Sequence, residues 1–359
     1  MNETIAKTAP LLWASLWTLA AIALAAAATR IFRSVAIRAG LYAEPNPLVP
    51  HHREPVAYLG GLGIALSVFT CTSFWFLWDN PGPDSQVLTL LTGTLGFLIL
   101  GLLDDLVALR PFKKLILQLL AAGFAANLGF VAAWTDSYTL DCMLSVTWIV
   151  AVVNAVNFTD VSDGLVAGLS IIALGAMAAL LPQQATLILI AAGACGGFLW
   201  LNLPPAQIYL GDAGSHFLGS FLALLAITFL QSDGVWLRIP IALLVLGVFS
   251  FESVFITAAR INKGLPWWKG SPDHFALRLQ EAGFNRTQVN GLAWLAGLVL
   301  GITAVLINSI SLNESVLPYV GIFMMTLFIW RFLWRLRTPN TERVLPVQPD
   351  AATRSQPPD

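Results

Sequence analysis

The stretch 164-GLVAGLSIIALGAMAALLPQQATLILIAAGACGGFLWLNLPPAQIYLG-211 contains no Asp, Glu, Lys or Arg. A membrane-spanning helix needs about 20 mostly apolar residues. The segment Pro182-Gln183-Gln184 divides the stretch into two parts of roughly that length, and proline does not fit the interior of a helix. The stretch therefore predicts two consecutive membrane helices joined by a short turn.

The rest of the chain has the same character. Of its 359 residues, 57% are hydrophobic and only 11% are charged, whereas a soluble domain carries about 25% charged residues. This composition predicts an all-α polytopic membrane protein with about eleven helices. The expected spans are 11–31, 58–78, 87–103, 115–134, 140–158, 164–181, 185–202, 213–230, 236–257, 291–310 and 315–333. They form a single transmembrane domain over residues 1–337, and the polar, proline-rich tail 338–359 is expected to be disordered.

The basic residues predict the orientation, because cytoplasmic loops carry an excess of Lys and Arg. With the N-terminus outside and eleven spans, seventeen of the nineteen Lys and Arg residues fall inside, and only Lys7 and Arg238 fall outside. The C-terminus is then inside. The net charge of −1 provides no overall field that would attract nucleic acid, so no nucleic-acid partner is expected.

The same topology places the polar motifs on one side of the membrane. Asp104 and Asp105 end the third span, and Asp212 opens the eighth. Asn154, Asn157, Asp160 and Asp163 occupy the inner end of the fifth span and the turn after it. Asp212 could simply cap its helix, and the two asparagines could join neighbouring helices. Carboxylates at membrane depth are costly unless they pair or serve a site. Their convergence on the cytoplasmic face favours a functional site.

Oxygen ligands without histidine or cysteine suit a hard divalent cation, Mg²⁺ or Mn²⁺. Mg²⁺ commonly binds one or two carboxylates and completes its shell with substrate phosphates. Phosphoryl transfer requires neutralisation of charge on the transferred phosphate and an aligned nucleophile. A membrane protein with such a site on its cytoplasmic side is expected to join a soluble phosphate-bearing donor to a lipid acceptor.

Five motifs in this order resemble the polyprenyl-phosphate N-acetylhexosamine-1-phosphate transferases, glycosyltransferase family 4. The family includes phospho-N-acetylmuramoyl-pentapeptide transferase and the enzymes that initiate O-antigen and teichoic-acid linkage. The motifs are 53-REPVAYLGG-61, 101-GLLDDL-106, 114-KLILQ-118, 154-NAVNFTD-160 and 211-GDAGS-215. The resemblance covers residues 45–290 and implies a multi-pass enzyme of the bacterial inner membrane whose active site faces the cytoplasm.

The resemblance implies transfer of a sugar-1-phosphate from a UDP-sugar to undecaprenyl phosphate with release of UMP, which starts a cell-envelope polysaccharide. Asp212 would be the principal Mg²⁺ ligand, and Asp104 would position or deprotonate the lipid phosphate. Asp105, Asn157 and Asp160 would support the metal and the diphosphate. Lys114 would neutralise phosphate charge, and Asp163 would contact the uracil or ribose. Asn154, His274 and Arg278 complete the predicted substrate-binding residues.

Two stretches depart from the family pattern. The usual Asp-Gly-Leu-Asp-Gly-Leu reads 160-DVSDGL-165, so Val161 replaces a glycine that could adopt positive φ or allow close approach to the nucleotide. The usual His-x-His-His-Arg-Leu reads 274-HFALRL-279 and keeps one histidine of three. His274 and Arg278 could still face the site together, or His274 could be an interfacial surface residue. Glu252 is expected to be a packing partner, with Arg260 as its counter-charge.

Two other classes of function stay open at this point. A transporter would also carry membrane carboxylates, but its site would lie near the midplane, usually between repeats. A non-catalytic family member acting as an assembly scaffold would fit the changes at Val161 and in the histidine motif. The resemblance also leaves open the donor sugar, the polymer, a homodimer, and direct attack against a covalent intermediate.

Overall fold

The computed structural model describes residues 2–43, 55–79, 85–232 and 234–339. It contains thirteen α-helices in the described ranges. They are α1 (Asn2–Ala39), α2 (Gly60–Asp79), α3 (Ser85–Val107), α4 (Pro111–Asn127), α5 (Tyr138–Thr159), α6 (Leu165–Leu180), α7 (Ala185–Asn202), α8 (Gly211–Leu230), α9 (Val235–Val245), α10 (Gly247–Asn262), α11 (Phe275–Glu281), α12 (Arg286–Ile307) and α13 (Leu312–Arg335). The predicted all-α class is confirmed.

The remaining elements are small. A 3₁₀ turn, η1 (Pro182–Gln184), separates α6 from α7 where the sequence predicted the break. The strands β1 (Tyr42–Ala43) and β2 (Val56–Ala57) form an antiparallel pair that the sequence did not predict. Residues 53 and 54 of the first motif, the tail from residue 340, and the basic residues Arg343 and Arg354 lie outside the described residues.

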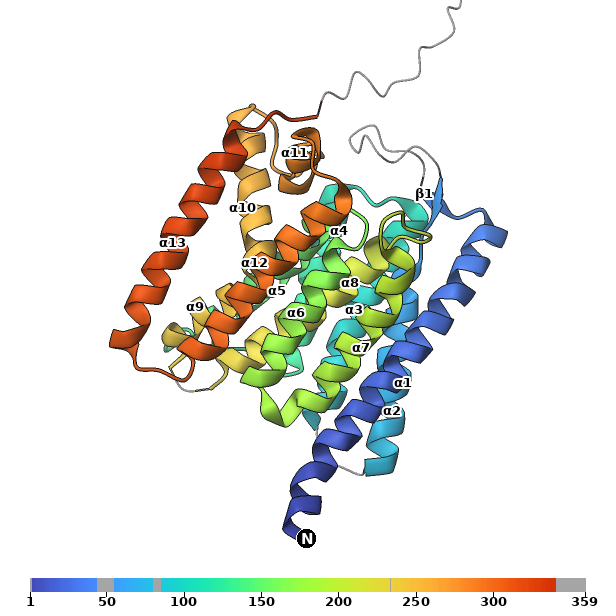
Figure 1. Cartoon of the computed structure of the whole chain (residues 1–359), viewed down its shortest axis with the longest axis vertical. Coiled ribbons are helices and arrows are strands. Elements are labelled where there is room, and N and C mark those ends of the chain that lie inside the picture. The colour runs from blue at the N-terminus through green and yellow to red at the C-terminus, as the bar shows by residue number, and fades with distance from the viewer. Residues whose placement is uncertain (1, 44–54, 80–84, 233, 340–359) are drawn as a thin grey trace, which may run out of the picture.

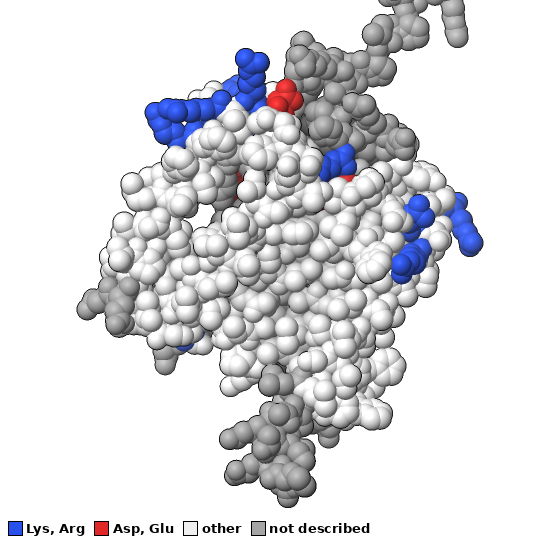
Figure 2. Space-filling view, viewed as in Figure 1, with Lys and Arg blue, Asp and Glu red and all other residues white. Residues whose placement is uncertain are grey.

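The helices have the length and composition of a polytopic membrane protein. Eight described helices are long and apolar enough to cross a membrane, and α9 with α10 would make a ninth span. All eleven predicted spans overlap a helix, but α4 and α6 are shorter than the eight, so the count of eleven stays a prediction, as does the orientation. Figure 2 shows Lys and Arg gathered near one end of the molecule above a broad surface almost without charge.

Two predicted spans differ in shape from the structure. The segment 236–257 is not one continuous helix, because α9 and α10 meet at an angle of 81°. Pro240 lies inside α9 and removes a backbone donor, and the chain leaves helical geometry at Leu246. The segment 115–134 is helical only to Asn127, since Gly129 adopts a φ of +101° and the chain then runs irregularly.

Helix α8 lies at the centre of the bundle, where it packs against α2, α3 and α5 (Figure 1). Nearly every residue after its first turn is buried. Glycines allow the close approach of its N-terminal end. A Cβ at Gly61 would lie 2.1 Å from the Cα of Gly214, and one at Gly101 would lie 2.2 Å from the carbonyl oxygen of Asp212. The motif glycines therefore set the position of Asp212 through backbone packing.

Candidate active site

A cavity of about 1280 Å³ opens at the end of the bundle where α3 and α5 end and α4 and α8 begin. The described residues that line it come from seven helices, α3, α4, α5, α7, α8, α11 and α12, and from the loops beside them. Eight of the ten predicted site residues line it: Asp104, Asp105, Lys114, Asn154, Asn157, Asp160, Asp163 and Asp212. The two others, His274 and Arg278, are not among the residues that line it. The fold thus brings together motifs that are more than 100 positions apart.

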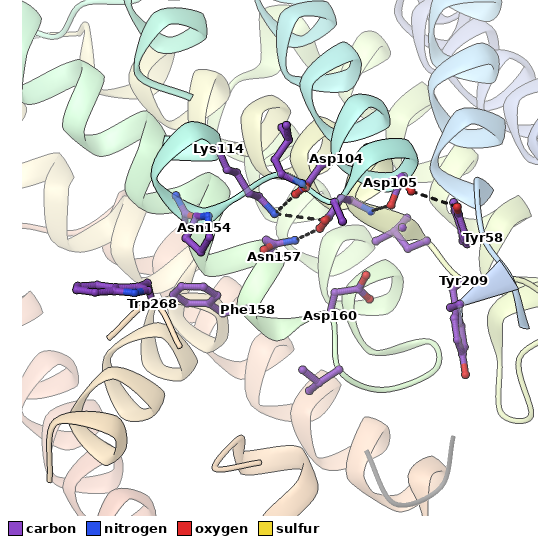
Figure 3. A pocket seen from close by; sticks show the side chains of 18 of the residues that line it. Tyr58, Asp104, Asp105, Lys114, Asn154, Asn157, Phe158, Asp160, Tyr209 and Trp268 are labelled. Carbon is purple, nitrogen blue, oxygen red and sulfur yellow. Dashed lines mark hydrogen bonds and ion pairs between the residues drawn. The ribbon is translucent and has the colours of Figure 1, made fainter. Parts of the chain in front are cut away.

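The centre of the cavity holds four side chains, called here the cavity cluster: Asp104, Lys114, Asn157 and Asp212. Lys114 Nζ lies 2.7 Å from Asp104 Oδ2 and 3.3 Å from Asp212 Oδ2. Asn157 Nδ2 donates to Asp212 Oδ1 at 2.5 Å (Figure 3). The side chain of Asp212 remains 32% exposed. It is therefore held from two sides and still open to the cavity.

Asp104 and Asp105 adjoin in sequence but make different contacts. Asp104 Oδ1 accepts from the backbone N–H of Leu109 at 2.7 Å, which fixes the turn from α3 into α4. Asp105 accepts from the backbone N–H groups of Asp212 and Ala213 at 2.8 and 2.9 Å. It thus satisfies donors at the first turn of α8, which otherwise have no partner within the helix. The α8 cap comes from Asp105, whereas the side chain of Asp212 accepts from Asn157 and Lys114.

A buried polar network lies beneath the cavity cluster. His216 is fully buried, and its Nδ1 lies 2.8 Å from the carbonyl oxygen of Asp212. A carbonyl can only accept, so Nδ1 carries the proton and Nε2 accepts from Gln118 Nε2 at 3.1 Å. Asn154 Nδ2 in turn donates to Gln118 Oε1 at 2.8 Å. This chain of contacts joins α8, α4 and α5 directly below Asp212.

Asp160 directly follows the end of α5 at Thr159 and lies in the turn before α6. Burial, together with the negative charges of Asp212 and Asp105, raises the pKa of Asp160 to about 8. A positive group nearby would favour the ionised form of Asp160, whereas the neighbouring negative charges disfavour it. Its neighbour Val161 is partly buried and lines the cavity.

Asp163 lies at the other end of the cavity in the loop before α6. Its Oδ2 pairs with Arg286 Nη1 and accepts from the backbone N–H of Ala206. Asn290 Nδ2 donates to its carbonyl oxygen at 2.7 Å. The next residue, Gly164, has a φ of +77° and donates its N–H to Asn202 Oδ1 at 2.8 Å. Side chains from α7 and α12 therefore fix this loop.

Several cavity residues were not singled out from the sequence: Tyr58, Arg110, Phe158, Asn202, Tyr209, Trp267, Trp268 and Arg286. Some carried a usable signal. Tyr209 lies three positions before Asp212, and Arg286 begins a helix whose Asn285 and Gln288 form a capping box. Asn202 ends an apolar helix just before two prolines. Trp267 and Trp268 stand in a loop whose path the pattern did not predict.

His274 and Arg278 belong to a second group, called here the loop-anchor cluster: Glu252, Asp273, His274 and Arg278. His274 Nδ1 lies 2.6 Å from Glu252 Oε1. Arg278 Nη2 lies 2.9 Å from Asp273 Oδ1, and its Nη1 donates to backbone carbonyls at the end of α13. Glu252 is a packing partner as expected: it lies against His274 and accepts from the backbone N–H of Phe275. Arg260 interacts electrostatically with Glu252, as a counter-charge does, and donates to Ser271 and the carbonyl of Trp267. The role of His274 and Arg278 as substrate contacts stays a prediction.

Lys263 also pairs with Asp273, at 2.6 Å. Burial by itself would raise the pKa of the Asp273 carboxyl, but Lys263 and Arg278 together hold that pKa below its usual value. The loop-anchor cluster thus ties α10, α11 and the end of α13 together through buried polar contacts.

The lining of the cavity offers oxygen ligands of the kind that Mg²⁺ prefers. Its described residues include five aspartates and three basic side chains, Arg110, Lys114 and Arg286. No group of three or more His, Cys, Asp or Glu among the described residues is arranged to hold a metal ion. Since Mg²⁺ needs only one or two carboxylates when phosphates complete its shell, the open carboxylate of Asp212 fits such an ion in chemistry.

Comparisons of the sequence with known proteins identify the family. Residues 87–230 match the model for glycosyl transferase family 4. A probable undecaprenyl-phosphate N-acetylglucosaminyl 1-phosphate transferase of Bacillus subtilis is 28% identical over 315 residues, 84% of this chain and 86% of the relative. The phospho-N-acetylmuramoyl-pentapeptide-transferase of Halalkalibacterium halodurans is 30% identical over 290 residues, 73% of this chain and 86% of that protein. The chain belongs to glycosyl transferase family 4, the polyprenyl-phosphate sugar-1-phosphate transferases.

Proposed function

We propose that the protein transfers a sugar-1-phosphate from a UDP-sugar to undecaprenyl phosphate and releases UMP, as the first membrane step of a cell-envelope polysaccharide. The observation that carries this proposal is the cavity cluster, in which a lysine lies between two carboxylates at one end of an apolar bundle. The names of the relatives support the same reaction. An apolar bundle in the membrane suits a lipid acceptor, and a polar cavity at its end suits a charged donor.

In the proposed reaction, an oxygen of the lipid phosphate attacks the β-phosphorus of the donor. The bond from that phosphorus to the bridging oxygen breaks, and UMP leaves. Lys114 neutralises charge on the phosphates, and Asp104 orients the acceptor phosphate through Lys114. Direct attack is the simpler route, since one cavity would hold the lipid phosphate and the donor diphosphate next to each other.

Asp212 would be the principal ligand of Mg²⁺, or of Mn²⁺, which supplies Lewis-acid neutralisation of the diphosphate when bound. Asn157 holds Asp212 in place from α5. Asp105 holds the backbone of the same residue, so we propose that it acts on the site by fixing α8. Asp160 lies between the two ends of the cavity, where it would face the diphosphate.

The two ends of the cavity suit different parts of the substrates. Phe158, Trp267 and Trp268 line one end, with the two tryptophan rings 5.5 Å apart. Asp163, Asn202 and Tyr209 line the other end. Apolar aromatic rings suit an isoprenoid chain, and the polar end suits a nucleoside. We propose that the lipid enters beside the tryptophans and that the uridine lies near Asp163.

Orientation is part of the proposal. The basic residues favour a cytoplasmic position for the cavity, where nucleotide-sugars are available. The protein would then lie in the bacterial inner membrane with its N-terminus outside and its C-terminus inside. A homodimer is compatible with the family resemblance. It would not alter the assignment of the cavity, whose lining comes from one chain.

One assay tests the reaction. Purified protein is incubated with undecaprenyl phosphate, Mg²⁺ and a panel of UDP-sugars that includes N-acetylglucosamine, N-acetylgalactosamine and 6-deoxy N-acetylhexosamines, and UMP release is measured. We expect release with at least one donor and loss of release with EDTA. No release with any donor, while a known family member is active in the same mixture, would refute the reaction.

A further inference from the structure

A second cavity of about 420 Å³ lies away from the active site, where the ends of α10 and α13 meet. We call it the α10–α13 pocket. The described residues that line it are Ala259, Asn262, Lys263, Arg278, Trp334, Leu336, Arg337 and Thr338. None of them lines the active-site cavity. Three of these residues are basic and none is acidic, so the composition of the pocket suits an anion.

The basic side chains of the pocket outnumber the carboxylates that contact them among the described residues. Lys263 and Arg278 both pair with the buried carboxylate of Asp273, at 2.6 and 2.9 Å. The side chain of Lys263 is still 41% exposed, and its ammonium group has three N–H donors. Arg337 is exposed at the mouth of the same pocket. Three basic side chains against one carboxylate leave two positive charges at this place.

The wall of the pocket on the α13 side is fixed. Arg278 Nη1 donates to backbone carbonyls at the end of α13, those of Leu333, Trp334 and Leu336, at 3.2, 3.4 and 3.3 Å. Carbonyls at the end of a helix have no partner within it, so the guanidinium closes the C-terminus of α13. The ring of Trp334 also stacks on that of Trp330, with centroids 5.8 Å apart. The pocket is therefore built by buried contacts and not by loose surface side chains.

The pocket lies where an apolar surface meets a basic one. Only 6% of the candidate span Ser315–Arg335 in α13 is buried inside the protein, and Phe323, Phe328 and Phe332 are exposed on it. Figure 2 shows Lys and Arg gathered at the end of the molecule where Figure 1 places the ends of α10 and α13. Trp334 lines the pocket, and tryptophan is enriched at membrane–water interfaces. The pocket thus stands at the level of lipid headgroups.

We propose that the α10–α13 pocket binds the phosphate of an anionic glycerophospholipid, whose acyl chains lie along the exposed apolar face of α13. Basic pockets between transmembrane helices suit anionic headgroups, and the planar fork of arginine matches phosphate oxygens. Lys263 and Arg337 face the phosphate from the two helix ends that form the pocket. A zwitterionic headgroup carries its own cation, which the two net positive charges repel. This site does not depend on the proposed transfer reaction.

The test is native mass spectrometry of the full-length protein in detergent, titrated with phosphatidylglycerol or with phosphatidylcholine of the same acyl chains. Wild type should bind one phosphatidylglycerol about 10- to 30-fold more tightly, as two net positive charges near a membrane surface predict. Arg337→Gln should weaken phosphatidylglycerol binding about 5-fold, the effect of one basic side chain, and should leave phosphatidylcholine binding unchanged. Arg335→Gln is the matched control, because Arg335 is exposed on the last turn of α13 but does not line the pocket.

A further arm separates a lipid from a free phosphate. Inorganic phosphate carries the same group without acyl chains, and at ten times the lipid concentration it should not displace phosphatidylglycerol. Displacement would assign the pocket to a soluble anion and overturn the proposal. Equal affinity of wild type for the two lipids would also overturn it, as would equal losses in Arg337→Gln and Arg335→Gln, which would indicate general surface charge. UMP release in phosphatidylcholine should be the same in Arg337→Gln and wild type, so a failed transfer reaction leaves this test intact.

Discussion

The cavity cluster and the loop-anchor cluster are both built from charged motif residues, yet they differ in how each is held. The backbone of Asp212 is positioned by packing at Gly61, Gly101 and Gly214, and its carboxylate, which contacts Lys114 and Asn157, still stays 32% exposed to the cavity. Asp273 and Glu252 are fully buried, and their carboxyl groups are already in contact with Arg278 and Lys263 and with His274, respectively. In the cavity cluster, backbone packing fixes the position of Asp212, so its carboxylate can also bind a ligand. In the loop-anchor cluster, the carboxylates themselves make the contacts that fix the structure, so they are not accessible to a ligand.

The largest effect is expected at the open carboxylate. Asp212→Asn keeps the size and the backbone contacts of the residue but removes the charge available to a cation. We expect transfer to fall at least about 10³-fold, the order seen when preorganised charge stabilisation is lost, with little change in melting temperature. UMP release and thermal melting would be measured together. Asp136→Asn, at an exposed position far from the cavity, is the control, and retained activity in Asp212→Asn would show that the cluster does not act through Asp212.

Substitutions in the loop-anchor cluster should lower the stability of the protein rather than its transfer activity. Asp273→Asn leaves Arg278 buried without its carboxylate, and breaking a buried ion pair from one side costs about 3–5 kcal/mol. We expect a large drop in melting temperature, while KM for the donor stays within about 2-fold in the protein that remains folded at low temperature. A variant of wild-type stability but raised KM would place Asp273 with the cavity cluster.

The same pair gives a pH dependence. The folded-state pKa of Asp273 lies below its unfolded value of about 3.9. Its contribution is therefore fully present above that unfolded value and is lost as the pH falls through the lowered folded pKa. The difference in melting temperature between wild type and Asp273→Asn should be constant from pH 6 to 8 and should shrink below about pH 4. A difference that shrinks instead near neutral pH would contradict this account.

The comparison also predicts that the cavity cluster is sensitive to backbone spacing. In Gly101→Ala the new Cβ would meet the carbonyl oxygen of Asp212 and would displace the start of α8. Overpacking of this kind costs about 1–3 kcal/mol, and transfer should fall with it. Gly123→Ala in α4 is the matched control, because nothing lies within 4 Å of its Cβ position; there we expect unchanged activity and a gain of about 0.5–1 kcal/mol from helix propensity. Equal behaviour of the two variants would refute the role of the glycines.

The sequence predicted much of the fold because the relevant signals are local. Apolar length located the helices, and Pro182 located the turn between α6 and α7. The 81° break before Gly247 was missed, because Pro240 and Gly247 lie in a run that is apolar on both sides of the bend. Of the site, the motif aspartates and asparagines were found by type and order. Arg286 and Tyr209 were missed, since their relevance depends on which loop α12 packs against.

His274 and Arg278 show the limit of motif spacing most clearly. The spacing of four residues between His274 and Arg278 allows two side chains that face one site. In the structure both are buried in the loop-anchor cluster, because α13 supplies carbonyls to Arg278 and α10 supplies Glu252 to His274. Such partners come from distant parts of the chain, and no pattern within 274–279 encodes them.

His274→Ala gives the smallest expected effect and decides between the two readings of that residue. The substitution leaves Glu252 buried without its partner at 2.6 Å, which costs about 1–3 kcal/mol for an unsatisfied group. If His274 only anchors the loop, melting temperature falls and KM for the UDP-sugar is unchanged. If it contacts the donor, KM rises by more than the loss of folded protein explains. His274→Gln can still donate to Glu252 and should recover most of the stability. If stability recovers but KM for the UDP-sugar stays high, His274 contacts the donor.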